Sequence, residues 1–320
     1  MNRTSIAVAA LAALSALPAA AQNYPNRAIR LVVPSSPGGG TDITGRIVAN
    51  KLSEQLGQQV VVDNRAGAGT IIGIEIAAKA PPDGYTILMG LSTLAINPSM
   101  YTKLPYDAMK DLAPISLAVL SPNILTVHPS VPAKTVKEFI ALAKAKPGTI
   151  TFGSAGQATS PHLSGELLKV LAKIDIVHVP FKGSGQSVIS SLAGEIAANF
   201  PSVPTAIPYI KAGKLRGLGV TMAKRTAALP EVPSIAEAGV PGYEATQWFG
   251  VLAPAGTPRP IIDRLNAEIV KLLKSPNVRD RLIADGTDPA PTTPEEFGAY
   301  IKSETEKWTK VIKAAGIKPQ

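Results

Sequence analysis

A glycine-rich stretch, VVPSSPGGGTD at residues 32–42, joins an apolar run (Ile29–Val33) to a helical pattern (Ile43–Leu56). The apolar run predicts a buried strand, and the prolines and glycines predict a tight turn after it. Thr41 and Asp42 are residue types that favour a helix start. Such a helix N-terminus carries free N–H groups and a partial positive charge, and it can bind an anion without a cationic side chain. The alternative is an ordinary glycine-rich turn without a ligand.

Composition sets the class of protein. A chain of 320 residues with 45% hydrophobic content can bury a large core and is long enough for two domains. It has no cysteine, which excludes disulfides, thiolate metal sites and a cysteine nucleophile. The net charge is +9, but the basic residues are scattered and not clustered, so we expect no nucleic-acid partner. The three histidines lack the spacing of metal ligands, so we expect no metal site.

The first residues have the pattern of an export signal. Asn2 and Arg3 give a short positive start, Ile6–Leu17 is apolar, and Ala19-Ala20-Ala21 offers a cleavage site before Gln22. We expect residues 1–21 to be a cleavable secretory signal peptide. The mature protein is then an exported one, located in the periplasm of a cell with two membranes.

The residues after the signal alternate between strand and helix patterns. Strands are expected at Arg30–Val33, Gln59–Asp63 and Tyr85–Met89, with helices at Ile43–Leu56 and Thr70–Ala80 between and after them. Continuous apolar strands between amphipathic helices indicate a mostly parallel sheet that helices cover on both faces. This α/β pattern defines the first lobe.

A second run of strands and helices repeats this plan. A long apolar stretch, Ile115–Val127, precedes it and suits a crossover between two lobes. We expect residues 22–120 together with 222–320 to form lobe 1 and residues 121–221 to form lobe 2. Each lobe would be a mostly parallel sheet flanked by helices, with a ligand cleft between the lobes.

Two further turns within these lobes are rich in small residues. Gly67, Gly69 and Gly73 resemble a dinucleotide fingerprint with one residue too many, in the second strand–helix unit of the lobe and not the first. We interpret them as a tight turn with helix–sheet packing and expect no cofactor. The other turn, GSAGQATSP at residues 153–161, repeats the logic of the opening stretch: Thr159 or Ser160 can cap a helix, and Pro161 suits its first turn. Two anion-receptive turns predict a cleft that closes on an acidic ligand.

Six segments, taken in order, resemble one known family. They are PGGGTD (37–42), VVDNRAGAG (61–69), PDGYT (82–86), FKG (181–183), WFG (248–250) and APAGTP (253–258). Together they span essentially the whole mature chain and resemble the Bug family, the periplasmic solute receptors of tripartite tricarboxylate transporters. The resemblance implies a two-lobed periplasmic-binding-protein fold of type II that closes on a small carboxylate. It also implies that backbone N–H groups and hydroxyls of the two turns hold the carboxylate and that a membrane permease receives it.

The resemblance carries over to particular positions of this sequence. In the first lobe it implies Gly39, Gly40, Thr41 and Asp42, and in the second Ser154, Ala155, Gly156, Gln157, Ala158 and Thr159. Further candidates for the ligand site are Ser35, Ser36, Ser92, Lys182, Ser202, Gln247 and Trp248. Three of these residues keep two interpretations. Asp42 can cap its helix and not meet the anion, Lys182 can be a solvated loop residue, and Trp248 can lie in the core or, as we favour, in the pocket wall.

The sequence also departs from the family pattern in ways that bear on the ligand. Ser35 stands where an aromatic ring is usual, and Ala158 replaces a frequent glycine. Pro201 and Ser202 stand where an acidic residue is common, which removes a partner for a ligand amino group. We therefore expect a plain mono- or dicarboxylic acid, aliphatic or aromatic, and not an amino acid.

A secreted hydrolase of small carboxylate esters is the alternative function. Ser154 and Ser184 follow glycines but lack the glycine two positions earlier that marks a nucleophile elbow. His162 is expected to be a structural hydrogen-bonding residue and not a base. We therefore predict a binding protein that is not an enzyme. We also expect it to be a monomer.

Overall fold

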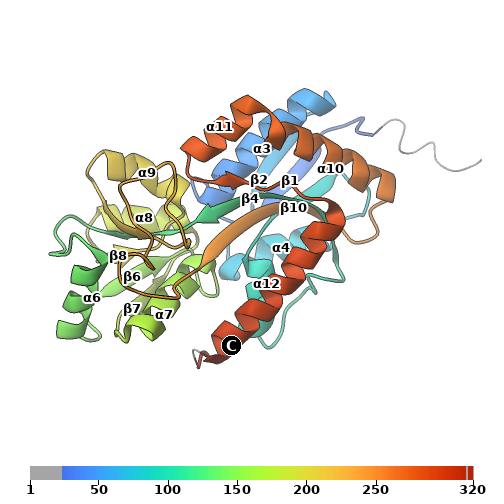
Figure 1. The fold of residues 1–320 in the computed structure, drawn as a ribbon. Coiled ribbons are helices and arrows are strands. Elements are labelled where there is room, and N and C mark those ends of the chain that lie inside the picture. Colours follow the sequence, from blue (N-terminus) through green and yellow to red (C-terminus); the bar gives the residue numbers. More distant parts are fainter. Residues whose placement is uncertain (1–23, 315, 320) are drawn as a thin grey trace, which may run out of the picture.

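The chain forms two α/β lobes, each built on its own sheet and connected by crossings of the chain (Figure 1). This computed structural model describes residues 24–314 and 316–319, so the expected signal peptide, residues 1–21, lies outside the described residues. Within the described part of the chain, no helix has the length and apolar character needed to cross a membrane.

The first lobe is built on a six-stranded sheet in the order β11-β4-β10-β3-β1-β2. Its strands are β1 (Ile29–Val33), β2 (Val60–Asn64), β3 (Thr86–Leu91), β4 (Leu112–Pro122), β10 (Thr246–Pro254) and β11 (Asp288–Pro289). β1 runs parallel to β2 and β3, whereas β10 runs antiparallel to both β3 and β4. The expected α/β sheet is therefore confirmed. Strands β1 to β4 run in one direction, and the sheet is mixed because β10, which re-enters from the other lobe, and β11 run the opposite way.

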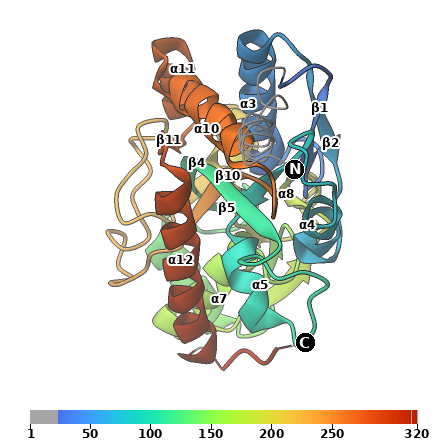
Figure 2. The same ribbon diagram turned by 90° about the vertical axis from the view of Figure 1, so that its right-hand side faces the viewer.

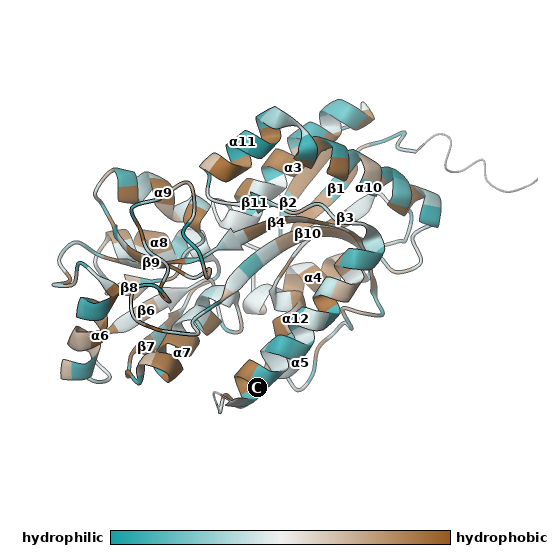
Figure 3. Ribbon diagram, in the orientation of Figure 1, coloured by the Kyte–Doolittle hydropathy of each residue, from teal (hydrophilic) through white to brown (hydrophobic). Residues whose placement is uncertain are grey.

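Helices cover both faces of this sheet, as alternation along β1 requires. Leu31 and Val33 face one cluster of buried side chains, while Val32 faces the other. The first face is covered by α3 (Gly40–Leu56), α10 (Arg259–Lys274) and α11 (Pro276–Ala284). The opposite face is covered by α4 (Ile71–Ala78), α5 (Thr93–Met100) and α12 (Pro294–Ala314), with α12 beside α5 in Figure 2. In Figure 3 the strands of this sheet are coloured mainly as apolar, whereas the helices around them carry both polar and apolar residues.

The second lobe is built on a five-stranded sheet in the order β7-β6-β8-β5-β9. Its strands are β5 (Ile124–Val127), β6 (Thr151–Ser154), β7 (Val177–Pro180), β8 (Ala198–Asn199) and β9 (Arg216–Val220). Its helices are α6 (Val136–Ala145), α7 (Ser160–Ala172), α8 (Ser184–Leu192) and α9 (Val203–Lys211). β6 is parallel to β7 and β8, whereas β5 is antiparallel to β8 and β9, so this sheet is mixed as well.

The chain crosses between the sheets at two adjacent places. Asn123 separates β4 from β5, and residues 221–245 lead from β9 back to β10. The amide of Asn123 donates to Thr221 Oγ1 and the amide of Thr221 donates to the carbonyl of Asn123, both over 2.9 Å. Ile235 and Tyr243 still bond to the second lobe, to Val220 and Ser164. We therefore propose that lobe 2 extends from about residue 123 to about residue 245, and not from 121 to 221.

Candidate functional site

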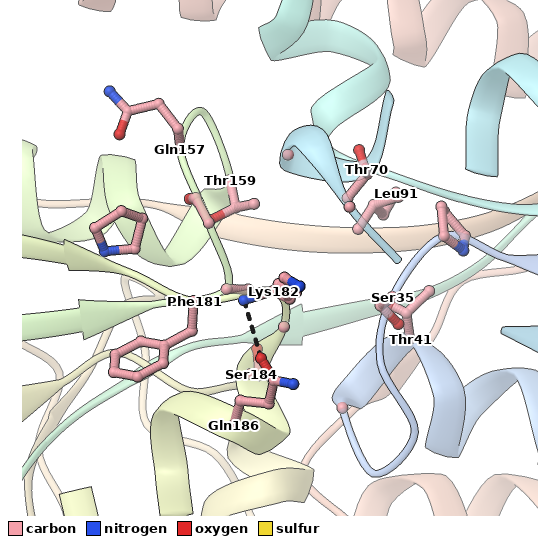
Figure 4. Close-up of a pocket in the computed structure, with 18 of the residues that line it drawn as sticks. Ser35, Thr41, Thr70, Leu91, Gln157, Thr159, Phe181, Lys182, Ser184 and Gln186 are labelled. Atoms are coloured by element: carbon pink, nitrogen blue, oxygen red, sulfur yellow. Dashed lines mark hydrogen bonds between the residues drawn. The ribbon is translucent and has the colours of Figure 1, made fainter. Parts of the chain in front are cut away.

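A cavity of about 600 Å³ lies between the lobes (Figure 4). The first lobe contributes the end of β1, the start of α3 and the loop before α4, and the second lobe contributes the loops before α7, α8 and α9. The lining consists of Pro34, Ser35, Gly39, Gly40, Thr41, Gly67, Ala68, Gly69, Thr70, Leu91, Tyr101, Ala155, Gly156, Gln157, Thr159, Pro180, Phe181, Lys182, Gly183, Ser184, Gln186, Ser202 and Gln247.

Several helix N-termini converge on this cavity. The residues that precede α3, α7, α8 and α9 are Gly39, Thr159, Gly183 and Ser202, and all four belong to the lining. None of them provides a side-chain cap to its helix. The first N–H groups of a helix have no partner inside the helix, so uncapped ends leave donors available. A missing cap is not distinctive alone, since α10 and α11 lack one too, but here four such ends share one cavity.

Two helices whose N-termini lie elsewhere, α6 and α12, show how this chain can satisfy such donors internally. Thr135 accepts a hydrogen bond from the amide of Glu138 at the start of α6. Thr293 and Glu296 form a reciprocal pair at the start of α12, in which each side chain accepts from the other residue's amide. The first is a side-chain N-cap and the second a capping box, and both leave fewer donors for a ligand. The four ends around the cavity are distinguished by their shared location, and their uncapped N–H groups are available to an external acceptor there.

The lining is nearly free of charged side chains. Lys182 is the one ionisable cation among the lining residues, it is exposed, and no acidic side chain lines the cavity. Burial raises the pKa of the Tyr101 phenol, so this lining residue is neutral at physiological pH. Partial charges of helix N-termini and one lysine therefore give the cavity a positive potential that favours an anion. No group of three or more His, Asp or Glu side chains in the described part of the chain is arranged to hold a metal.

Asp42 lies in the first turn of α3 but points away from the cavity. Its carboxylate accepts hydrogen bonds from the Gly38 amide (2.9 Å), Arg46 (3.0 Å) and Asn64 (2.9 Å). Burial alone would raise the pKa of Asp42, but these hydrogen bonds outweigh it and lower the pKa. Asn64 also donates to the carbonyl of Ser35 over 3.0 Å. Asp42 thus holds the 35–39 turn in shape and leaves the helix donors beside it to face the cavity.

The 154–159 turn of the second lobe is held in a similar way. Ser154 Oγ accepts from the Gly156 amide over 3.1 Å, and Thr159 Oγ1 donates to the Gly156 carbonyl over 2.6 Å. Gly156 and Ala158 have positive φ angles of 127° and 61°. Such angles are unusual for alanine and require support from surrounding structure.

The lobes touch each other around the cavity through glycines. A Cβ on Gly40 would overlap Ser202 Oγ, and one on Gly69 would lie 2.6 Å from the carbonyl oxygen of Gln157. Each of these pairs joins one lobe to the other. The structure is therefore in a closed arrangement in which backbone meets backbone across the cleft.

Most of the residues expected from the sequence line the cavity. They are Ser35, Gly39, Gly40, Thr41, Ala155, Gly156, Gln157, Thr159, Lys182, Ser202 and Gln247. Six expected residues lie outside its lining: Ser36, Asp42, Ser92, Ser154, Ala158 and Trp248. Ser36 lines a neighbouring groove, and Ser92, Ser154 and Ala158 are buried behind the cavity wall. Trp248 is in the core, in edge-to-face contact with Phe297 and Tyr300 of α12, and not in the pocket wall as favoured from the sequence.

Other lining residues were missed in the sequence. The sequence favours a packing turn for the Gly67–Thr70 loop. Gly73 does pack closely on Pro34, but the loop itself faces the cavity. Ser184 and Gln186 lie at the start of α8, where the side chain of Gln186 accepts from the Lys182 amide over 3.2 Å (Figure 4). Their signal was available, because glycine-rich turns before helices α4 and α8 repeat the pattern of the opening stretch.

The hydrolase alternative finds no support in this geometry. Ser154 Oγ and His178 Nε2 are 2.6 Å apart, a distance that a serine nucleophile and its base would have. However, Ser154 is fully buried, neither residue lines the cavity, and Ser154 also bonds to the Gly156 backbone. The pair therefore lies behind the binding surface and has no access to a substrate there.

Two lobes on mixed sheets, a double crossover and a donor-rich cavity between the lobes define a solute-binding protein of the periplasmic-binding-protein type. The comparisons give the family. Residues 44–317 match the model of the tripartite tricarboxylate transporter family receptor, and the chain belongs to this family. Its members are receptors and not enzymes, so this chain is a solute-binding receptor.

Relatives and solved structures agree with this family. The protein BugT of Bordetella pertussis is 38% identical over 98% of this chain and 95% of its own length. An R. palustris protein solved with adipate is 36% identical and has a TM-score of 0.91, with coverage of 93% of this chain and 100% of that one. MatC from Rhodopseudomonas palustris, solved with malate, is 29% identical with a TM-score of 0.84, over 90% of this chain and 100% of that one. The expected resemblance to the Bug family is confirmed.

Proposed function

We propose that this receptor captures a small carboxylic acid between its lobes, mainly through backbone N–H groups and hydroxyls. One observation carries the proposal: four uncapped helix N-termini from two lobes meet in one cavity with a single charged side chain. Such ends bind anions through oriented donors and the helix dipole. Thr41, Thr159, Ser184 and Ser202 add hydroxyl groups to the same lining.

The ligand in this proposal is a plain mono- or dicarboxylic acid and not an amino acid. An α-ammonium group buried in the cavity would need an acidic partner, because an unpaired buried charge is costly. No acidic side chain lines the cavity, and the nearby carboxylate of Asp42 is already bonded to Gly38, Arg46 and Asn64. A volume of about 600 Å³ suits a small molecule. The adipate and malate in two related structures support an acid of this kind.

Binding in this proposal stabilises the closed form. An anion between the lobes contacts donors from both, so it shifts the population of open and closed forms toward the closed one. The paired crossings at Asn123 and Thr221 are the natural hinge. We propose that the protein acts in the periplasm after loss of residues 1–21 and that a membrane permease of the tripartite type receives the acid. The cavity is complete within one chain, which supports a monomeric receptor.

A melting screen of the mature protein tests this function. Adipate, malate, benzoate, aspartate, glutamate and glucose would be added at increasing concentration, with melting temperature as the readout. A ligand at 100 times its dissociation constant stabilises the folded state by about 2.7 kcal/mol. We expect at least one plain acid to raise the melting temperature. Stabilisation by glucose alone, or by aspartate or glutamate more than by any plain acid, would contradict the proposal, and turnover of an added ester would favour the hydrolase.

A further inference from the structure

Two histidines form a stacked pair directly behind the 154–159 binding turn. The rings of His162 on α7 and His178 on β7 have centroids 4.0 Å apart and planes 26° apart. Neither residue lines the cavity; His162 is only 4% exposed, and His178 is half-buried. Burying two titratable rings in contact is costly unless both are neutral and hydrogen-bonded. The function of the receptor as described above uses neither ring directly.

Each ring holds the backbone of the turn. His162 Nδ1 accepts a hydrogen bond from the Ala158 amide over 3.3 Å. His178 Nε2 lies 2.6 Å from Ser154 Oγ, and Ser154 Oγ is bonded in turn to both the amide and the carbonyl of Gly156. These contacts reach the two residues of the turn that have left-handed backbone angles, Gly156 and Ala158. The histidine pair is therefore placed to keep the turn in a conformation that it would not hold alone.

The surroundings of the pair favour its neutral form. On α7, Glu166 Oε1 lies 3.8 Å from His162 Nε2, but Glu166 is already paired with Lys169 over 3.0 Å. On β6, the uncharged ring of Phe152 lies against His178, with centroids 5.0 Å apart. Burial and then the charge of Lys169 lower the pKa of His162 to about 4. Burial, then His162 and Lys169, lower the pKa of His178 to about 3.

We propose that the stacked His162–His178 pair is a positioning unit for the 154–159 binding turn and that it holds the turn only while His162 is neutral. The consequence for anion affinity rests on the proposed function, whereas the effect on the turn does not. Protonation of His162 would place an Nδ1–H donor against the Ala158 N–H donor, and two stacked imidazolium rings would repel each other. The turn would then lose its support, and the receptor would release its anion on acidification.

The sign of the pH effect follows from the direction of the shift. A histidine whose pKa is lowered when the turn is formed takes up a proton more readily when the turn is released. The histidine pair therefore supports the turn fully at a pH above the ordinary histidine pKa of about 6.5, and this support is lost as the pH falls toward 4. His162 has a pKa of about 4 in the formed turn. At pH 5 its protonation therefore shifts the equilibrium between the formed and the released turn by up to about 30-fold toward the released turn.

Hydrogen exchange in the ligand-free protein tests the pair separately from ligand binding. Exchange of the 154–159 amides would be compared at pH 7 and pH 5 in wild type, His162→Asn, His162→Leu and the control His128→Asn. The Oδ1 of asparagine can accept in place of Nδ1 but does not titrate, whereas leucine cannot accept. His128 is half-buried, bonds to Ser130 and lies away from the turn.

We expect wild type and His128→Asn to exchange faster at pH 5 than His162→Asn at the same pH, and His162→Leu to exchange fast at both. At pH 5, adipate should bind more tightly to His162→Asn than to wild type or His128→Asn, and it should bind weakly to His162→Leu at both pH values. Because variants are compared at the same pH, the protonation of adipate itself affects all of them equally. Equal exchange in wild type and His162→Asn at pH 5 would overturn the proposal. Failure of adipate, malate and benzoate alike to bind any variant would count against the proposed function alone. If His162→Asn does not fold, the ring ¹⁵N chemical shifts of the wild-type protein show which nitrogen of His162 carries the proton. A protonated Nδ1 in His162 at pH 7 would refute the positioning role.

Discussion

Replacing Gly183 by alanine should block closure of the lobes without harming either lobe. Gly183 precedes α8 in the second lobe and faces Ser36 of the first. An added Cβ would overlap Ser36 Oγ and lie 2.9 Å from Ser36 Cβ and 3.1 Å from its amide nitrogen. Rotation of the hydroxyl can relieve only the first contact. The φ of Gly183, 163°, is extended, so alanine adds no backbone strain there.

The magnitude follows from the cost of overpacking. An extra methyl group in a close-packed contact costs about 1–3 kcal/mol. Because the closed form holds the ligand, this cost appears as a loss of affinity, and at 1.4 kcal/mol per tenfold it amounts to about 5- to 150-fold. The ligand-free protein should melt close to wild type, since it can avoid the contact by opening.

Calorimetric titration with the most stabilising acid of the melting screen measures this effect. Gly298→Ala is the matched control, because Gly298 lies in α12, where a Cβ would meet only Pro114 at an ordinary 3.6 Å. Removing the opposing side chain in the double variant Ser36→Gly/Gly183→Ala should restore much of the affinity. Wild-type affinity in Gly183→Ala, or no recovery in the double variant, would show that the contact between Gly183 and Ser36 does not limit closure.

Three further substitutions test the positioning role of Asp42, the charge of Lys182 and the core packing of Trp248. Asp42→Asn should cost about 1–2 kcal/mol in urea unfolding, since it weakens buried charge-assisted bonds; because the pKa of Asp42 is lowered, the difference should shrink as pH falls below about 4. Lys182→Gln should weaken acid binding by less than about tenfold and reduce its salt dependence in titrations at two ionic strengths. Trp248→Phe should lower unfolding stability by about 1–3 kcal/mol in urea and leave acid affinity unchanged. Unchanged stability in the first, unchanged salt dependence in the second or lost affinity in the third would contradict these roles.

Local sequence patterns were sufficient for the turns and for much of the fold. The opening stretch predicted β1, a tight turn and α3, and Thr159 with Pro161 predicted the start of α7. The start of α3 was predicted too late, because Gly40 and Thr41 are already helical and Gly39 precedes them. In a sequence, a glycine at this place indicates a turn. Here Gly40 is already helical, and glycine is needed because a side chain at this position would overlap Ser202 of the other lobe.

Contacts between distant segments could not be predicted in this way. The Gly67–Thr70 loop lines the cavity because Gln157 of the other lobe approaches Gly69, and nothing local encodes that approach. Alternation along β10 places Gln247 and Trp248 on opposite faces, but only the packing of α12 decides that Trp248 is in the core. His162 and His178 are likewise brought together only by the fold of the second lobe.

In the proposed function, main-chain donors of both lobes hold a carboxylate in this cavity. A crystal structure of the mature protein with the acid that stabilises it most would show these contacts. We predict carboxylate oxygens about 2.7–3.1 Å from backbone N–H groups at the start of α3 and in the 155–159 turn. An acid bound outside the cavity, or held in it by side-chain charges without main-chain donors from both lobes, would contradict the account.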